Sequence, residues 1–240
     1  MSQESQESTA TLEPTTSVLD NAAWYSLVGR HAALSEGNEL ARRFLPEVSR
    51  FAGVADWEHP DVWDAIVDLV GRDAPFPFSG NRPTLPHGWA VDASGEGVQL
   101  VETDALVTRP DDEAVVLGAA DVPAMLDLVA RTQPGPFSPR THELGRYVGI
   151  RRGGALVAMA GERLQPDGWT EISAVCTDAE HRGQGLATRL VLDVAHHVRE
   201  RGDRALLHAA ATNTGAIAIY ERLGFTLRRR TTFGQLRTPA

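Results

Sequence analysis

Apolar positions follow a helical spacing in two stretches of the chain. The first lies between His59 and Gly71, where Pro60 suits a first helical turn and Gly71 suits the end. Its apolar residues share one face, and they are Val62, Trp63, Ile66, Val67 and Val70. The second predicts a helix from about residue 186 to 201, ended by Gly202. Its apolar face consists of Leu186, Leu190, Val194 and Val198.

Shorter apolar runs bounded by turn-forming or charged residues predict strands. They lie at 98–102, 114–117, 147–150, 155–160, 171–177, 205–209, 225–227 and 231–236. Arg152–Gly154 predicts a hairpin turn between two of them. Two further helices are expected over 121–131, with Asp121 as the N-cap, and over 214–222. The alternation after residue 113 predicts an α/β (α+β) fold.

Composition divides the chain into three parts. Residues 1–18 are rich in Ser, Thr, Glu and Gln, which predicts a disordered tail. Residues 19–110 hold four of the five tryptophans and predict a smaller α/β domain, which ends near the polar stretch Thr108–Glu113. Residues 1–110 carry 7 arginines against 17 acidic residues, whereas residues 111–240 carry 16 against 15. This charge asymmetry also favours a second domain at 111–240.

The overall composition excludes several classes of protein. Hydrophobic residues make up 42% and charged residues 23%, as in soluble globular proteins, and no apolar run approaches the ~18 residues of a membrane helix. A net charge of −9 argues against nucleic-acid binding. The N-terminus has no apolar signal segment, and the single Cys176 cannot form an internal disulfide, so we expect a cytoplasmic protein. The adjacent His196 and His197 do not share a helix face, and no metal is expected.

The junction Arg182–Ala187 carries the most informative pattern. Gly183 and Gly185 lie two residues apart just before a predicted helix, where the backbone can approach a bulky ligand. The free N–H groups of the first helical turn and the helix dipole then favour an anion such as a phosphate. Position 188 is Thr, so the dinucleotide-binding fingerprint is incomplete, and the chain has no lysine for a Walker A loop. Taken alone, this pattern also fits an ordinary tight turn.

A second motif about thirty residues downstream changes the interpretation. It runs Asn213-Thr-Gly-Ala-Ile-Ala-Ile-Tyr220-Glu-Arg-Leu-Gly224-Phe225. Together the two motifs resemble the GNAT superfamily of acyl-CoA-dependent N-acetyltransferases, over about residues 112–240. Three residues before Gly183, where members of this superfamily often have Gln or Arg, this chain has Glu180. The segments 160–163, 171–177 and 207–213 resemble the branch related to glycine N-acyltransferase, whose members carry a degenerate GNAT-like domain at the N-terminus.

The resemblance implies a fold and a cofactor site. The fold is a central mixed, mostly antiparallel, splayed sheet flanked by helices, preceded by the smaller N-terminal domain. The co-substrate is acetyl-CoA, with its pyrophosphate on the glycine loop and its pantetheine arm along the splayed strand. The residues implied for the cofactor are Val175, Cys176, Thr177, Arg182, Gly183, Gln184, Gly185, Leu186, Ala187, Thr188, Asn213, Ala216 and Tyr220.

The resemblance also implies catalytic roles. Tyr220 would protonate the departing thiolate, and Glu171, with Glu162 as the rival, would accept the proton of the amine. Phe137 and Arg140, in or next to the Pro-rich loop, are candidates for the acceptor site, where Arg140 would hold a carboxylate.

Several other residues favour structural interpretations. Cys176 is interpreted as a small core residue, because no base is spaced to activate it. We interpret His208 as a packed, hydrogen-bonded histidine. The run Arg228–Arg230 could contact a CoA phosphate, but short basic runs are usually solvated.

The leading hypothesis is an acetyltransferase that acts on the primary amine of a small molecule, such as an amino acid or related metabolite. A non-catalytic acyl-CoA sensor and a protein N-acetyltransferase are the alternatives. A homodimer is compatible with the sequence, which does not fix the oligomeric state.

Overall fold

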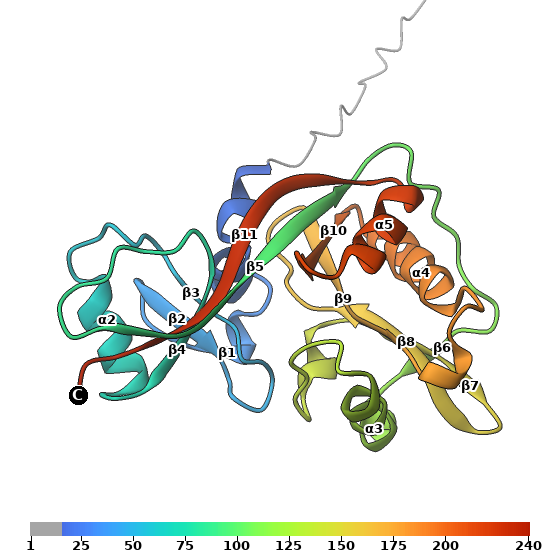
Figure 1. Ribbon diagram of the computed structural model, residues 1–240, viewed down its shortest axis with the longest axis horizontal. Helices are drawn as coiled ribbons and strands as arrows, with labels where there is room; N and C mark the ends of the chain where they lie inside the picture. Colours follow the sequence, from blue (N-terminus) through green and yellow to red (C-terminus); the bar gives the residue numbers. More distant parts are fainter. Residues whose placement is uncertain (1–15) are drawn as a thin grey trace, which may run out of the picture.

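The computed structural model describes residues 16–240, which form a three-stranded and an eight-stranded sheet with helices around them (Figure 1). Of the predicted tail 1–18, residues 1–15 lie outside the described part. Residues 16–18 belong to the 3-10 helix η1 (Thr16–Asn21). No helix among the described residues is long and apolar enough to cross a membrane.

The N-terminal part builds the small antiparallel sheet in the order β1-β2-β3. The apolar face of helix α2 packs over it, which confirms the helix predicted between His59 and Gly71. The face buries Val62 and Ile66 against Val54 and Phe76. The elements are α1 (Ala22–Val28), η2 (Ala32–Leu34), β1 (Ser35–Gly37), β2 (Ala41–Phe44), β3 (Ala52–Val54) and α2 (Val62–Val70).

The large sheet has the strand order β4-β11-β5-β10-β9-β8-β7-β6, and its one parallel pair is β9–β10. The predicted mixed, mostly antiparallel sheet is therefore confirmed. So are the hairpin at Arg152–Gly154, between β7 and β8, and the expected helices α3, α4 and α5. The elements are β4 (Pro75–Gly80), β5 (Ala90–Glu102), β6 (Val115–Leu117), η3 (Ala119–Asp121), α3 (Val122–Thr132), η4 (Thr141–Leu144), β7 (Tyr147–Arg152), β8 (Ala155–Glu162), β9 (Trp169–Thr177), η5 (Ala179–His181), α4 (Leu186–Glu200), β10 (Arg204–Ala210), α5 (Thr214–Leu223) and β11 (Phe225–Arg237).

Strands β5 and β11 form a long ribbon that runs from the large sheet to the N-terminal part (Figure 1). The prediction of a short strand at 98–102 and of two separate C-terminal strands was wrong. The pairing is continuous from Phe225 opposite Glu102 to Arg237 opposite Ala90, with a bulge between Leu227 and Arg229. Backbone hydrogen bonds between the two strands continue past glycine and charged residues. The alternation of apolar and polar residues is interrupted there, so the pattern did not predict the full length of the strands.

The ribbon also crosses the boundary expected near residue 110. Strand β5 precedes that boundary in the chain, yet it pairs with β10 on one side and with β11 on the other. Val98 and Leu100 of β5 belong to the core beneath α4 and α5. The large sheet therefore contains strands from both sides of the boundary expected near residue 110.

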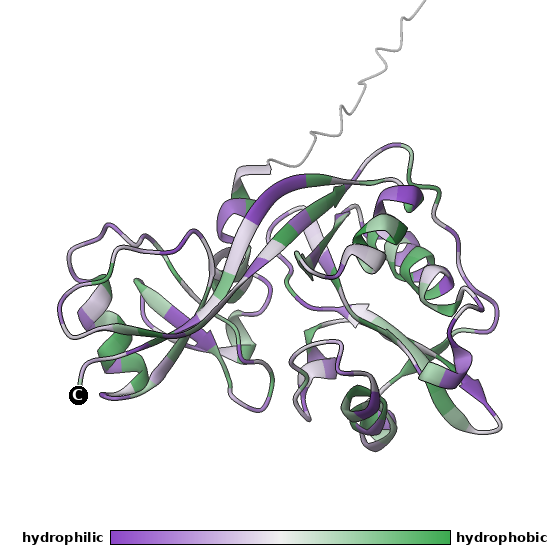
Figure 2. Ribbon diagram, in the orientation of Figure 1, coloured by the Kyte–Doolittle hydropathy of each residue, from purple (hydrophilic) through white to green (hydrophobic). Residues whose placement is uncertain are grey.

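The helices cover both faces of the large sheet. The apolar residues of α4, among them Leu186, Leu190 and Val194, are buried against the sheet, while polar residues also occur along the helix (Figure 2). Helix α3 packs on β8 and β9 within a second cluster, around Met125 and Leu128. Asp121 does not cap α3 as expected, because its Oδ2 accepts a hydrogen bond from the Gly118 N–H at 2.9 Å and closes the η3 turn instead.

Candidate active site

The glycine loop lies between β9 and α4, as its sequence predicts. Gly183 and Gly185 have φ angles of 76° and 73°, in the left-handed region where glycine avoids steric strain. A Cβ built on either glycine meets no atom within 4 Å, so the space above both is open. The N-terminus of the fifteen-residue helix α4 begins directly after Gly185. This open cradle and the N–H groups of the first turn suit a pyrophosphate.

Strand β9 carries a bulge beside the loop. The register with β8 shifts between Met159 and Gly161, and Ala174 adopts a φ of 53°, which is unusual for a residue with a Cβ. On the other side, the parallel pairing with β10 ends at Ile172 opposite Leu207, although both strands continue. The two strands therefore separate beyond these residues, as the resemblance implied, and the gap can admit an extended chain.

Helix α5 contributes two of the predicted residues. Asn213 caps the helix, because its Oδ1 accepts a hydrogen bond from the Ala216 N–H at 3.2 Å. Tyr220 is 8% exposed, and burial raises its pKa to about 12. The hydroxyl is therefore protonated across the physiological pH range and can serve only as a proton donor there.

One cavity of about 1590 Å³ joins these elements. Of the thirteen residues implied for the cofactor, Tyr220 among them, all but Gln184 line this cavity. Burial raises the pKa of the Cys176 thiol, and Cys176 packs among apolar residues, in agreement with its interpretation as a core residue.

The N-terminal part forms the opposite wall of this cavity. Its residues come from the segment after β2, from β4 and from β5, and they include Arg50, Phe51 and Phe78. Phe233 of β11 lies beside them. A Cβ at Gly97 would lie 2.3 Å from the Phe233 ring, and one at Gly234 would lie 2.3 Å from the Phe78 ring, so these glycines make room for the aromatic wall. No sequence motif pointed to these residues.

Glu171 lies beneath the cavity in a buried ion pair with Arg163. Its carboxylate is fully buried and accepts hydrogen bonds from Arg163 Nε at 2.9 Å and from His208 Nδ1 at 2.7 Å. Burial alone would raise the pKa of this carboxyl, but the Arg163 charge and these hydrogen bonds outweigh it and hold the pKa well below its usual range. Such a carboxylate is a weak base, and it does not line the cavity. The geometry thus favours an anchoring role over the catalytic role expected from the sequence.

His208 is packed and hydrogen-bonded, as predicted. The Gln99 Oε1 accepts a hydrogen bond from Arg228 at 2.8 Å, so the Gln99 amide group donates to the Leu19 carbonyl and towards His208 Nε2, at 2.9 and 3.0 Å. His208 Nε2 is therefore the acceptor, and Nδ1 carries the proton given to Glu171. This assigned tautomer leaves no free lone pair on the His208 ring, so His208 is a poor candidate for a base.

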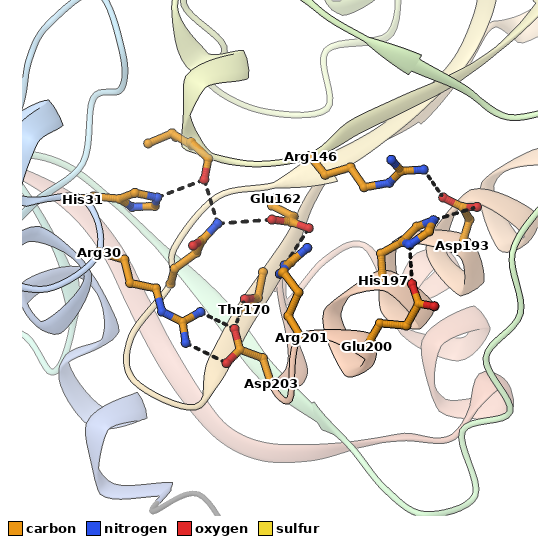
Figure 3. A network of polar contacts seen from close by, with 12 residues as sticks. Arg30, His31, Arg146, Glu162, Thr170, Asp193, His197, Glu200, Arg201 and Asp203 are labelled. Atoms are coloured by element: carbon orange, nitrogen blue, oxygen red, sulfur yellow. Dashed lines mark hydrogen bonds and ion pairs between the residues drawn. The ribbon is translucent and has the colours of Figure 1, made fainter.

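Glu162, the rival candidate, is occupied elsewhere. Its carboxylate accepts hydrogen bonds from Arg201 at 2.9 Å (Figure 3) and from the Gln165 side chain at 3.1 Å. It is 1% exposed and does not line the cavity. Neither glutamate expected as the base is thus positioned to reach a substrate in this cavity.

The residues expected for the acceptor are also displaced from the cavity. Phe137 packs edge-on against Tyr147, with 5.6 Å between ring centroids. Arg140 pairs with Glu143 and Glu47 at 2.7 and 2.8 Å. Only the preceding loop residues 132–136 line the cavity. The run Arg228–Arg230 lies outside the lining too, and Arg228 and Arg229 pair with Asp20.

Among the described residues that line the cavity, Glu96 on β5 carries the one carboxylate. Within residues 16–240, Glu96 makes no side-chain hydrogen bond or ion pair, and the same is true of Arg50. The described part of the chain contains no cluster of three or more His, Cys, Asp or Glu side chains that could hold a metal ion.

Comparisons with known sequences agree with this architecture. The family model described as FR47-like protein matches residues 147–233. The mycothiol acetyltransferase of Thermobispora bispora is 35% identical over 102 residues, which are 42% of this chain and 35% of that protein. This match therefore spans about a third of that relative's length. The N-alpha-acetyltransferase RimI of Mycobacterium tuberculosis is 33% identical over 137 residues, which are 50% of this chain and 85% of that protein.

Solved structures extend the likeness to the N-terminal part. A protein from Novosphingobium aromaticivorans that was assigned to the GNAT family of acetyltransferases is 34% identical, with a TM-score of 0.83. The match covers 92% of this chain and 99% of that one. A GCN5-related N-acetyltransferase from Kribbella flavida shares the fold, with a TM-score of 0.61 and 22% identity over 92% of this chain and 96% of its own. The glycine cradle, the separated strands and these similarities establish that this chain belongs to the GNAT family of acetyltransferases.

Proposed function

We propose that the protein transfers an acetyl group from acetyl-CoA to the primary amine of a small molecule, by direct attack. The observation that carries this proposal is that the cavity is continuous. It joins the glycine cradle and the gap between β9 and β10 to a wall built by the N-terminal part. Both reactants can therefore lie in one space, with the reacting ends brought together.

Acetyl-CoA supplies the acetyl group as an activated thioester. Gly183 and Gly185 leave room for its pyrophosphate, and the side chain of the exposed Arg182 adds positive charge beside them. Val175 and Thr177 line the gap where the pantetheine arm would pair with the strand. A backbone N–H of this strand would polarise the thioester carbonyl.

The amine must lose its proton before it can attack. For an amine with an ordinary pKa this costs roughly 4–5 kcal/mol near pH 7. Glu96 is suited to accept the proton, directly or through water, because it is the carboxylate that lines the cavity and it has no partner among the described residues. Tyr220 is suited to protonate the departing thiolate, since its high pKa keeps the hydroxyl proton in place.

A protein N-terminus as the acceptor is the second candidate. It is favoured by the relative named N-alpha-acetyltransferase RimI and by a ribosomal-protein-bS18-alanine N-acetyltransferase of Escherichia coli, which is 30% identical over 82% of its length. Each match covers half of this chain or less, so a large part of it has no counterpart in those relatives. Residues of the N-terminal part line the same cavity as the cradle, which supports a small acceptor bound between them.

The test combines calorimetric binding of acetyl-CoA with thiol release against amines, amino acids and short peptides. Binding with turnover of a small amine supports the proposal, whereas turnover of peptides alone supports the second candidate. Binding with no turnover across the panel would indicate a sensor. Absence of binding would contradict the interpretation of the glycine cradle. The relationship to the glycine N-acyltransferase branch, and a degenerate GNAT-like unit at 19–110, stay predictions.

A further inference from the structure

Arg50 differs from the other arginines around the cavity because, within residues 16–240, its side chain makes neither a hydrogen bond nor an ion pair. Arg43 pairs with Glu36 at 2.7 Å, Arg163 pairs with the buried Glu171, and Arg182 donates to the Thr177 carbonyl at 3.4 Å. Arg50 is exposed, lines the cavity and has no hydrogen bond or ion pair within residues 16–240. A guanidinium without a partner in a binding cavity is available to an anionic group of a ligand.

The segment that carries Arg50 is held firmly in place. The Phe44 N–H donates to the Phe51 carbonyl at 3.1 Å and closes the connection between β2 and β3. From the large sheet's side, the Thr141 hydroxyl donates to the Val48 carbonyl at 2.6 Å, in a buried contact. Arg50 is therefore presented by a fixed connection, which lowers the entropic cost of binding.

Phe51, the next residue, connects this segment with the ion pair of Arg163 and Glu171. The Phe51 ring lies under the guanidinium of Arg163, 4.4 Å from its carbon, and Arg163 in turn pairs with Glu171 on β9. Glu171 thus neutralises Arg163 and the Phe51 ring covers one face of its guanidinium, so within residues 16–240 Arg50 is the cation on this wall without a partner. The neighbouring rings of Phe51, Phe78 and Phe233 add an aromatic surface to this wall.

The acidic character of residues 1–110 does not extend into the cavity. This part carries 17 acidic residues, but within the described residues Glu96 alone lines the cavity. The wall therefore does not select for a cationic acceptor through its net charge. Within residues 16–240, the wall presents Arg50 and Glu96 without side-chain partners, beside the three phenylalanine rings.

We propose that the acceptor carries a carboxylate as well as its amine, and that Arg50 binds this carboxylate. This inference rests on the proposed function. The acceptor class is an amino acid or a related amino carboxylate with an apolar side chain, whose carboxylate pairs with Arg50 while its side chain packs on the phenylalanine wall. Arg50 determines specificity and takes no part in the transfer itself.

The test uses matched acceptors that differ by one carboxylate: glycine and methylamine, leucine and 3-methylbutylamine, phenylalanine and 2-phenylethylamine. We expect the full-length protein to prefer the carboxylate member of the pair that it acetylates. Arg50→Gln should raise KM for that member by roughly 10- to 100-fold and leave kcat/KM for the decarboxylated amine unchanged. Arg42→Gln is the control, because Arg42 lies on the adjoining strand, binds Ser35 and does not line the cavity.

Two results would overturn the inference. One is an equal preference for both members of every pair, and the other is an equal effect of Arg50→Gln on both. If no acceptor is turned over, the proposed function fails separately. The subsite is then judged by calorimetry of the same amino acids with CoA-saturated protein. Binding that is lost in Arg50→Gln but kept in Arg42→Gln supports the subsite, and binding that is absent or unaffected contradicts it.

Discussion

Tyr220 and the ion pair of Glu171 with Arg163 show two different uses of burial at the scale of single residues. Burial raises the pKa of Tyr220 to about 12 and keeps its proton available. Burial of Glu171 is offset by Arg163, so this carboxylate stays charged and anchors its neighbours. Tyr220 is therefore suited to donate a proton, and Glu171 is suited to fix the position of the residues around it.

Replacing Tyr220 by phenylalanine should lower kcat by roughly 10- to 100-fold. This is at or below the low end of general acid catalysis, because a thiolate whose thiol pKa is near 8.5 can also leave unaided. The KM for acetyl-CoA should stay within about twofold, since the ring remains in place. Steady-state thiol release measures both constants. An unchanged kcat would contradict a role for the hydroxyl in the rate-limiting step.

Glu171→Gln should destabilise the protein by about 3–5 kcal/mol, because it leaves the buried Arg163 charge without compensation. The depressed pKa of Glu171 also makes stability depend on pH. Its contribution is fully present above the unfolded pKa of ~4.3 and is lost as pH falls towards the lower folded pKa. Urea unfolding between pH 3 and 7 should show this acid loss in the native protein and a weaker slope in the variant. Glu58→Gln, at an exposed position whose side chain has no partner within residues 16–240, should change stability by less than about 0.5 kcal/mol.

At the scale of secondary-structure elements, the site depends on where β9 ends and α4 begins. The bulge at Ala174 and the loss of pairing after Ile172 open the sheet, and the left-handed glycines then direct the chain into the helix. These features are local, because they arise within about fifteen consecutive residues. The cofactor end of the cavity is therefore a property of one strand-loop-helix unit.

Gly185→Ala should weaken acetyl-CoA binding by roughly tenfold or more, because its Cβ would occupy the open cradle. The left-handed backbone should also cost about 1 kcal/mol of stability. Gly202→Ala is a matched control. Gly202 has a similar φ of 83°, its Cβ would also meet no atom within 4 Å, and it does not line the cavity. Both variants should lose similar stability, but only Gly185→Ala should lose affinity in calorimetry. Equal affinities would show that the loop does not hold the cofactor.

The same locality explains which parts of the site the sequence could predict. Gly183, Gly185, Asn213 and Tyr220 lie in two short motifs, and the structure brings them to one cavity. The acceptor wall has no such motif, because the pairing of β4 with β11 brings Phe78 and Phe233 together, and Phe51 joins them from the connection between β2 and β3. Arg140 was a plausible anion holder by its sequence position, but Glu143, one helical turn away, neutralises it. The extent of β5 was missed for the same reason, since its partner lies at the other end of the chain.

At the scale of the whole molecule, the ribbon of β5 and β11 joins the N-terminal part to the large sheet. Strand β5 lies inside that sheet, and β11 carries β4 on its other edge (Figure 1). The two parts share paired strands instead of a flexible linker. The wall of the cavity and its cofactor end are thus held in a fixed relation.

Cutting the chain between β5 and β6 should leave its two pieces associated. A protease site inserted beside the exposed Val107 would allow this cleavage. The pieces should elute together by size exclusion under native conditions and separate only in denaturant, because β5 stays paired with both β10 and β11. Separation at micromolar concentration without denaturant would show that residues 19–110 and 111–240 are independent units.

The strand order has a consequence for how the protein folds as it is synthesised. Strands β4 and β5 emerge from the ribosome early, but the partner that lies between them is β11, which is made after every other strand. The large sheet cannot be completed until Arg237 has been added. Until then, the edge of β5 that pairs with β11 has no partner strand, and β4 has no neighbour in the large sheet. Premature termination near residue 225 should therefore yield a chain that is captured by chaperones or degraded, even though most of its helices and strands have been translated.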